Sequence, residues 1–147
     1  MTACLNDFCK FYENFEKNNL FQLKEIYADN VQFIDPSHEI IGLSNLQSYF
    51  SVLMTEIEQC DFVIGEIFEK KQDTFVKNQE AMVLWEMTFA HPQLNKGKSI
   101  LVPGNSHIKF DHKIYYHRDY FDTTSMLYEY IPLLGFIIKK IKQRMLS

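Results

Sequence analysis

The spacing of hydrophobic and polar residues divides the chain into a helical first part, a strand-rich middle and a helical end. In the first part, apolar residues recur every three or four positions, which predicts helices over 5–18, over 20–27 and from Ser44 onward. A short strand over 31–35 interrupts these helices. It ends at Pro36, which has no backbone N–H to donate to a sheet.

After residue 60 the apolar residues recur at every second position, which indicates strands. Gly65 is expected to form a bulge in the first strand, and the third is expected to be interrupted near Pro103 and Gly104. The predicted strands cover 61–69, 80–90, 99–111 and 114–121.

The tail, over about 123–146, returns to helical spacing and is expected to kink near Pro132 and Gly135. Helices followed by consecutive antiparallel strands predict an α+β fold, with the helices packed on one face of a sheet. The chain contains no internal repeat or linker. We therefore expect a single domain over 1–147, with a core over about 5–122.

Composition narrows the possible partners. The chain has 147 residues, thirteen Phe and eight Tyr, so its core or cavity is expected to be walled by aromatic rings. Its formal charge is only −4, and no basic stripe alternates with exposed aromatic residues. A nucleic acid partner is therefore not expected.

The cysteines favour a reducing compartment. Cys4, Cys9 and Cys60 form no CxxC pair and no zinc spacing, so we expect reduced, buried thiols. The first residues show no signal peptide, and no apolar run is long enough to span a bilayer. The expected location is cytoplasmic.

The segment YADNVQFIDPSHEIIG, over 27–42, carries the clearest candidate for chemistry. Pro36 holds the residue before it in an extended conformation, so the Asp35 carboxylate is fixed at a strand end. Val31 and Phe33 lie on the same face of that strand. This placement suits a ligand cavity.

That segment, its closure at Gly42 and the later run HIKFDHKIYYHRDYFD resemble the nuclear transport factor 2-like superfamily, which includes SnoaL-like proteins and ketosteroid isomerases. The resemblance implies a cone-shaped, cystatin-like fold, in which a curved antiparallel sheet wraps around N-terminal helices and encloses a conical cavity. It also implies a homodimer formed through the convex face of the sheet. The C-terminal helix lies beyond the part that resembles the isomerases.

The resemblance implies that Asp35 is a general base, because it falls where ketosteroid isomerases place that Asp. Two other positions depart from the isomerases. Phe11 stands at the position of their oxyanion Tyr, with Tyr12 one step away, and Ser106 stands at the position of their protonated acid. These departures argue against ketosteroid isomerisation and leave other SnoaL-like chemistry open.

The alternation of the last strands gives further candidates. Ser106 and Ile108 are expected to face the cavity, and His107 to face away. In the last strand the pattern alone does not choose a face; the resemblance favours His117 and Asp119 as inward, with Cβ atoms about 7 Å apart. Arg118 would then lie on the convex surface.

The hypothesis is a pocket for a hydrophobic small molecule in which Asp35 is the base and His117 and Asp119 are acid or orienting partners. Such an isomerase, dehydratase or cyclase needs no cofactor. In the structural alternative, Asp35 caps a turn and His117 pairs with a neighbouring carboxylate. The expected ligand-binding residues are Tyr12, Tyr27, Tyr49, Trp85, Met87, Ser106, Ile108, Tyr115 and Phe121.

A metal site is not predicted. Asp35, His38 and Asp119 could be imagined as ligands, but no spacing in the sequence demands one.

The tail supplies an alternative function. It carries a stripe of apolar residues beside Lys139, Lys140, Lys142 and Arg144, and no acidic residue follows Lys139. This pattern is typical of a helix lying on a membrane surface, and also of a docked C-terminal helix whose lysines complement its dipole. The chain could thus be a non-catalytic binder of a hydrophobic or lipid-like ligand that contacts a membrane or a partner through its tail. A dimeric scaffold with a filled cavity is a third possibility.

Overall fold

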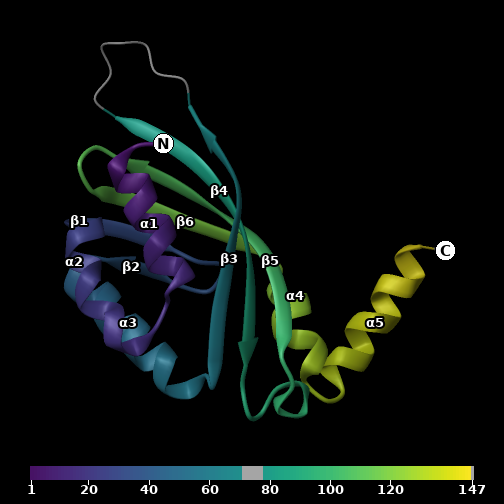
Figure 1. Ribbon diagram of the computed structural model, residues 1–147. Helices are drawn as coiled ribbons and strands as arrows, with labels where there is room; N and C mark the ends of the chain where they lie inside the picture. Colours follow the sequence, from purple (N-terminus) through teal and green to yellow (C-terminus); the bar gives the residue numbers. More distant parts are fainter. Residues whose placement is uncertain (71–77, 147) are drawn as a thin grey trace.

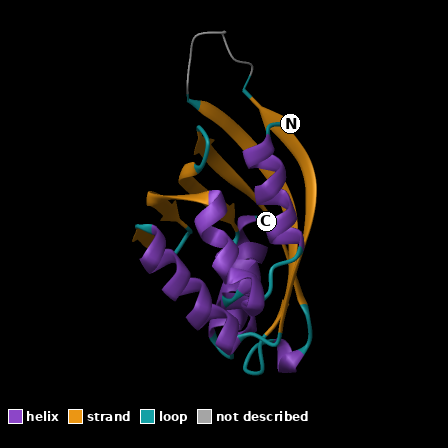
Figure 2. Ribbon diagram, turned by 60° about the vertical axis from the view of Figure 1, so that its left-hand side comes forward, coloured by secondary structure: helices purple, strands orange, loops and turns teal. Residues whose placement is uncertain are grey.

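The computed structural model describes residues 1–70 and 78–146, and shows a curved sheet with α1 and α3 on one face (Figures 1 and 2). The six strands of this described part lie in the order β2-β1-β6-β5-β4-β3. Neighbours are antiparallel, except that β1 and β6 are parallel. The strands are β1 (Tyr27–Ile34), β2 (Glu39–Ile41), β3 (Gln59–Glu69), β4 (Gln79–Ala90), β5 (Ile100–Phe110) and β6 (Ile114–Phe121).

The helices come mainly from the two ends of the chain. Those before β4 are α1 (Ala3–Glu13), the 3₁₀ helix η1 (Lys17–Gln22), α2 (Leu23–Ile26) and α3 (Leu43–Glu56); those after it are η2 (Asn95–Gly97), α4 (Thr123–Met126), η3 (Tyr128–Tyr130) and α5 (Leu134–Met145). The predicted α+β class is confirmed. The sequence did not indicate the parallel pair or β2.

The main core lies between the concave face of the sheet and the helices α1 and α3. Helix α1 begins after Thr2, whose side chain accepts a hydrogen bond from the backbone N–H of Leu5. Its apolar stripe buries Leu5 and Phe8 completely or nearly so, against Val83 of β4 and Ile108 of β5. This core fixes α1 over the centre of the sheet.

The first predicted helices are shorter than expected. Helix α1 ends at Glu13, and the side-chain N–H of the next residue, Asn14, caps this end by donating to the carbonyl of Lys10. The predicted helix over 20–27 is divided between the end of the 3₁₀ helix η1 and the α-helix α2, and it ends at Ile26. Strand β1 begins at Tyr27, four residues earlier than predicted, because this residue pairs with Ile114 of the distant β6.

The later strands match the alternating pattern closely. Gly65 lies in the predicted bulge, since the register of β3 and β4 shifts between Ile64 and Ile67. The predicted interruption at Pro103 and Gly104 is wrong, because β5 continues through both residues. Strand β6 ends opposite Gly104, so Pro103 has no β6 neighbour that would need its missing N–H.

The tail is not one kinked helix. It forms α4, η3 and α5 in succession, and Pro132 lies in the connection before α5. Met126 and Tyr130 pack against a smaller apolar cluster that contains Phe89 and Val102. No helix in the described ranges is long and apolar enough to cross a membrane.

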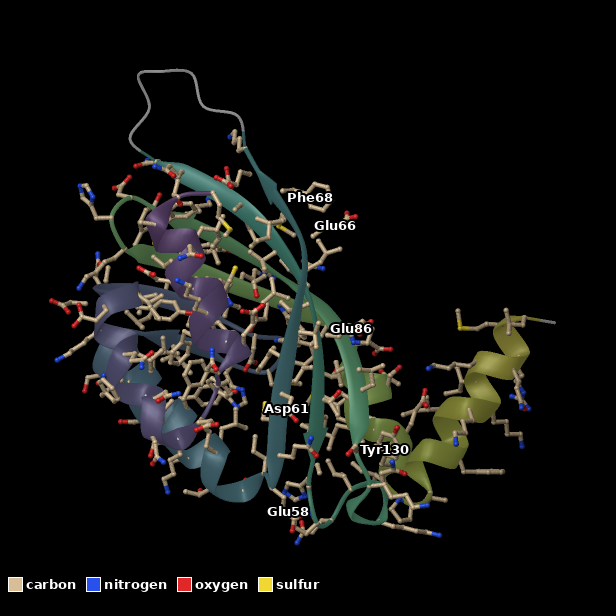
Figure 3. The ribbon with its side chains drawn as sticks, in the orientation of Figure 1. Glu58, Asp61, Glu66, Phe68, Glu86 and Tyr130 are labelled. Carbon is tan, nitrogen blue, oxygen red and sulfur yellow. The ribbon has the colours of Figure 1, made fainter. Side chains whose placement is uncertain are left out.

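The opposite, convex face of the sheet carries exposed side chains. Glu66, Phe68 and Glu86 lie on the side of the sheet away from α1 (Figure 3). Phe68 is 56% exposed, and Val63 of the same strand is 64% exposed. The two faces of the sheet therefore differ sharply in burial.

Candidate functional site

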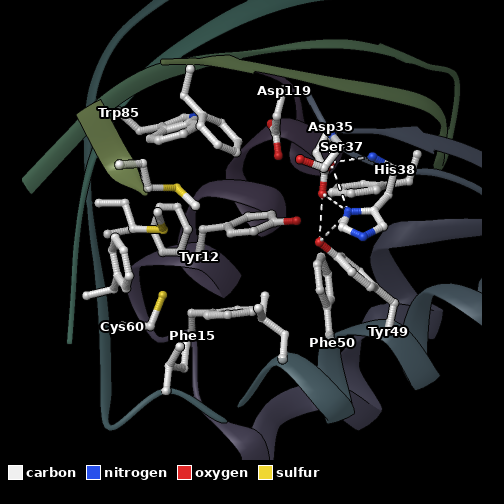
Figure 4. Close-up of a pocket in the computed structure, with 18 of the residues that line it drawn as sticks. Tyr12, Phe15, Asp35, Ser37, His38, Tyr49, Phe50, Cys60, Trp85 and Asp119 are labelled. Atoms are coloured by element: carbon white, nitrogen blue, oxygen red, sulfur yellow. Dashed lines mark hydrogen bonds and ion pairs between the residues drawn. The ribbon is translucent and has the colours of Figure 1, made fainter. Parts of the chain in front are cut away.

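A cavity of about 270 Å³ opens on the concave side of the sheet. Aromatic rings form most of its wall, and a few polar groups interrupt them (Figure 4). The rings are those of Phe15, Phe33, Phe50, Phe62, Trp85, Phe89 and Phe121, and the polar groups belong to Tyr12, Asp35, Ser37, His38, Tyr49 and Asp119. A mostly apolar wall with few polar groups is typical of a small-molecule site.

Asp119, on β6, is held through one of its two carboxylate oxygens. Its Oδ1 lies 2.5 Å from the Ser106 hydroxyl, which donates to it, and 2.7 Å from Nε2 of His117. The Ser106 hydroxyl in turn accepts a hydrogen bond from the Trp85 indole at 2.8 Å. No described residue donates to Oδ2, and the side chain borders the cavity. One oxygen is thus anchored, while the other is available to a ligand.

A buried chain of hydrogen bonds continues from the far side of the imidazole. Nδ1 of His117 lies 2.7 Å from the Tyr27 hydroxyl, which lies 2.8 Å from the Tyr12 hydroxyl. His117 is 1% exposed and Tyr27 is fully buried, yet Tyr12 borders the cavity. The chain therefore begins and ends at the same cavity, at Tyr12 and at Asp119.

The tyrosines of this site keep their protons at ordinary pH. Burial raises the pKa of Tyr12 and Tyr27 well above the usual value, because an oxyanion there would lose its hydration. Burial also raises the pKa of Tyr49, and its hydrogen bond to Asp35 raises it further. All three hydroxyls are therefore hydrogen-bond donors.

Asp35 is bound through both of its oxygens. Oδ1 accepts the backbone N–H groups of Ser37 and His38, each at 2.7 Å, which is the turn expected of an Asp before Pro. Oδ2 accepts the hydroxyl of Tyr49 at 2.6 Å. The His38 ring lies 3.2 Å from both oxygens. Asp35 borders the cavity, but it also braces the loop after β1 and connects it to α3.

The cavity brings together many of the residues that the sequence singled out. His117 and Ser106 stand directly behind Asp119 instead of bordering the main cavity, and Tyr27 stands behind Tyr12. Of the residues that the sequence singled out, the following border the cavity directly: Tyr12, Asp35, Tyr49, Trp85, Met87, Asp119 and Phe121.

Two predicted ligand-binding residues lie elsewhere. Phe110 pairs with Ile114 and Lys109 pairs with Tyr116, so Tyr115 is the extra residue of a bulge and the inward position passes to Ile114. Ile108 faces inward as expected, but it is fully buried in the core between the sheet and α1. Neither residue borders the cavity.

The expected orientation of two convex residues is confirmed. His107 faces away from the cavity, and its Nε2 lies 2.6 Å from a carboxylate oxygen of Glu80. Arg118 is exposed, with its guanidinium 5.0 Å from the centre of the Tyr120 ring.

Some lining residues were missed. Phe15 and Phe50 lie on the apolar stripes of the helical first part, and Phe62 shares a face of β3 with Cys60, so periodicity could have found them. Met126 and Leu127 also border the cavity, but the helical pattern of the tail gives no sign of that contact.

The cysteines are free and buried or half-buried. Burial raises the pKa of the Cys60 thiol, which borders the cavity, to about 12. A thiol with so high a pKa is a poor nucleophile. Within residues 1–70 and 78–146, no group of three or more His, Cys, Asp or Glu side chains is arranged to hold a metal ion.

Comparison with known families matches the SnoaL-like domain to residues 9–117. The chain belongs to the SnoaL-like domain family. No match was found among curated proteins. The fold predicted from the resemblance, a curved sheet around N-terminal helices, is confirmed, because solved structures of nuclear transport factor 2-like proteins share it.

Solved structures share this fold at low sequence identity. A putative SnoaL-like polyketide cyclase from Jannaschia sp. is 12% identical, with a TM-score of 0.67 over 84% of this chain and 88% of that chain. A similar putative cyclase from Shewanella putrefaciens is 15% identical, with a TM-score of 0.65 over 86% and 94%. A Catenulispora acidiphila protein with a ketosteroid isomerase-like fold, in complex with trimethylamine, is 13% identical, with a TM-score of 0.68 over 86% and 91%.

Proposed function

We propose that this SnoaL-like protein is an acid–base catalyst of isomerase, dehydratase or cyclase type, and that Asp119 is its base. The observation that supports this most is the one-sided bonding of Asp119 at the cavity wall. His117 and Ser106 hold Oδ1, while Oδ2 accepts no hydrogen bond from any described residue. A carboxylate fixed in this way keeps one oxygen for a proton of the ligand.

The proposed ligand is a hydrophobic small molecule with a C–H bond next to a carbonyl group. The aromatic wall suits an apolar skeleton, and a carboxylate can remove such a proton without a cofactor when a donor stabilises the developing oxyanion. Two neighbours in fold are described as putative polyketide cyclases, which supports the same broad class of reaction. Phe11, at the position of the isomerases' Tyr, is buried in the core.

Tyr12 is the proposed acid. When His117 is protonated, Nε2–H donates to Asp119 and Nδ1–H donates to Tyr27, whose hydroxyl then donates to Tyr12. The Tyr12 O–H is thereby directed to the ligand oxygen. As Asp119 takes the carbon proton, Tyr12 gives its proton to that oxygen and recovers one from His117 through Tyr27. The enol is formed with one proton removed and one supplied, and the reverse transfers at another carbon complete an isomerisation.

Asp35 has a positioning role in this proposal, in place of the role of base that the sequence hypothesis gave it. Both of its oxygens already accept hydrogen bonds, from two backbone N–H groups and from Tyr49. Those bonds leave neither oxygen free to take a proton from a ligand, and they fix the wall of the cavity. Replacement of Asp35 is therefore expected to weaken ligand binding more than the proton transfer itself.

Deuterium exchange tests the proposal without knowledge of the natural product. The probe is 2-tetralone, a bicyclic ketone, incubated with the protein in D₂O and followed by mass spectrometry. The sole tryptophan, Trp85, borders the cavity, so its fluorescence reports binding of the probe. Asp119→Asn is expected to slow catalysed exchange by about 10²-fold or more. The control Asp7→Asn changes an exposed carboxylate on α1 and should have no effect.

The second candidate function is binding of a hydrophobic ligand without catalysis. The predominance of apolar side chains on the cavity wall supports it, because such a wall holds a ligand without reacting with it. In this case 2-tetralone would change the Trp85 fluorescence, but its exchange would stay at the rate without protein. Asp119→Asn would then alter neither property.

A further inference from the structure

A groove adjoins the cavity near the end of β1. Its volume is about 580 Å³, and Asp35, Asp119 and Phe121 line both the groove and the cavity. Figure 4 shows Asp35 and Asp119 together on one side of the cavity. A ligand that is longer than the cavity can therefore extend past these two carboxylates into the groove.

The groove follows from the different lengths of β1 and β6. Ile34, the last residue of β1, lies opposite Arg118, and Pro36 then lies in the turn that leads to β2. Strand β6 continues to Phe121, and residues 119–121 pair with β5 alone. Side chains from both faces of β6 line the groove, so it runs along the open edge of this strand.

The groove offers two kinds of hydrogen-bond donor. Among the described residues that line the groove and the cavity, Arg118 is the only Arg or Lys. Its guanidinium lies over the Tyr120 ring and forms no ion pair with any residue that the structure describes. The second donor is the open edge of β6: neighbouring residues of a strand direct their N–H groups to opposite sides, so at least one N–H of residues 119–121 faces the groove. Both kinds of donor suit an anionic group.

The carboxylates that line the groove are occupied elsewhere. Both oxygens of Asp35 accept hydrogen bonds from the loop after β1 and from α3. Asp122 caps the first turn of α4, and Asp119 lies on the opposite face of β6 from Arg118. These acids repel an anion in the rest of the groove, so the guanidinium of Arg118 is the position that attracts it.

We propose that the ligand carries a carboxylate at one end of an apolar skeleton, and that Arg118 binds this carboxylate while the skeleton occupies the aromatic cavity. A planar guanidinium donates two parallel hydrogen bonds to a carboxylate, so it recognises the shape of this group as well as its charge. Together with the proposed function, this makes the ligand an apolar keto acid whose reacting carbon lies at Asp119. The inference rests on the cavity of the proposed function as the ligand site, and it does not depend on the proton transfer.

Two probes that differ only in charge test this contact. 6-Phenylhexanoate has a ring for the cavity and a carboxylate at the end of a methylene chain, and 6-phenylhexanamide is its neutral counterpart of the same length. The fluorescence of Trp85 in the cavity wall measures the dissociation constant of each probe. We expect the wild type to bind the acid about five- to tenfold more tightly than the amide. High salt should reduce this preference, because Arg118 is exposed.

Substitution of Arg118 separates its contribution from that of the cavity. Arg118→Gln is expected to weaken binding of the acid to the level of the amide and to leave binding of the amide unchanged. Arg118→Lys keeps the charge without the planar pair of donors, so it should keep part of the preference. The matched control is Lys109→Gln: Lys109 also lies over a ring on the convex face, 5.1 Å from the centre of Tyr116, but it does not line the groove. This control should keep the full preference.

The binding assay also distinguishes this inference from the catalytic proposal. Equal affinities of the wild type for the two probes, or an Arg118→Gln variant that keeps the preference for the acid, would overturn the carboxylate contact. If neither probe binds while 2-tetralone does, the contact is likewise overturned and the proposed function stands. If the acid is preferred but 2-tetralone shows no catalysed exchange, the contact stands and the catalytic proposal fails.

Discussion

The two faces of the sheet use similar residues for different purposes. On the concave face, His117 is 1% exposed and contacts Tyr27, Ser106 and Asp119. On the convex face, His107 is partly exposed and contacts Glu80. The comparison teaches that the chemistry of this fold depends on burial, since a His–carboxylate pair on the outside gives only a solvated contact.

The largest expected effect comes from removing the buried member of this pair. His117→Ala removes one hydrogen-bond partner from the buried Tyr27 hydroxyl and one from the Asp119 carboxylate. We expect the free energy of unfolding to fall by about 3–5 kcal/mol, measured by urea denaturation. His107→Ala, the matched control on the convex face, should cost less than about 1 kcal/mol. Equal costs for the two variants would contradict the comparison.

Gly104 gives the next largest effect, because Trp85 packs directly on its backbone. A Cβ atom at this position would lie 2.3 Å from the indole ring. Gly104→Ala is therefore expected to displace Trp85 and to cost about 2–3 kcal/mol of unfolding free energy.

Gly97→Ala serves as the control for this substitution. Its Cβ atom would meet nothing within 4 Å, so only the positive φ of 76° is unfavourable. A cost of about 1 kcal/mol is expected there. The fluorescence of Trp85 should change in the first variant and not in the second.

Two adjacent residues of β4 give a smaller test of the same contrast. Val83 faces the core and is fully buried, whereas Leu84 faces outward and is 39% exposed. Val83→Ala is expected to cost about 2 kcal/mol, and Leu84→Ala about 0.5 kcal/mol or less in the monomer. Urea denaturation at low protein concentration measures both values. A larger cost for Leu84→Ala would show that the strand faces are assigned wrongly.

Alkaline pH gives the most gradual effect. Burial raises the pKa of Cys4 and Cys9 from 9.0 to about 11, and that of Cys60 to about 12. Above pH 9 the unfolded chain therefore loses thiol protons that the folded chain keeps, so stability is complete below pH 9 and falls as pH rises to about 11–12. Thermal unfolding from pH 8 to 11 measures this loss. Replacing all three cysteines by Ala should delay this loss of stability until the tyrosines of the unfolded chain ionise near pH 10. An unchanged onset would contradict the assignment of the loss to the buried thiols.

Strand alternation and the family resemblance together predicted the location of the candidate site better than the roles within it. Alternation put Asp119 and His117 on one face of β6, the resemblance favoured that face as the inward one, and Pro36 placed Asp35 at a strand end. Alternation failed at Tyr115, because the bulge depends on how Lys109 and Phe110 pair across the ladder. Pairing across a ladder is a long-range property that one strand's own pattern does not contain.

The fold was predictable where local periodicity and a family resemblance agreed. The alternating residues of β4 and the stripe of α1 gave the two layers. The position of α5 was not predictable, because its contact with η3 relies on a backbone approach at Gly135 that hydrophobic spacing does not record. The bonds that occupy both oxygens of Asp35 likewise come from Tyr49, which lies on another element.

The rate of deuterium incorporation into 2-tetralone by Asp119→Asn, relative to Asp35→Asn and the wild type, tests the central claim most directly. With probe saturating each protein, as judged from Trp85 fluorescence, we predict that Asp119→Asn loses about 10²-fold or more of the catalysed rate and that Asp35→Asn keeps most of it. If Asp35→Asn abolishes exchange while Asp119→Asn keeps the wild-type rate, the assignment of Asp119 as the base is contradicted.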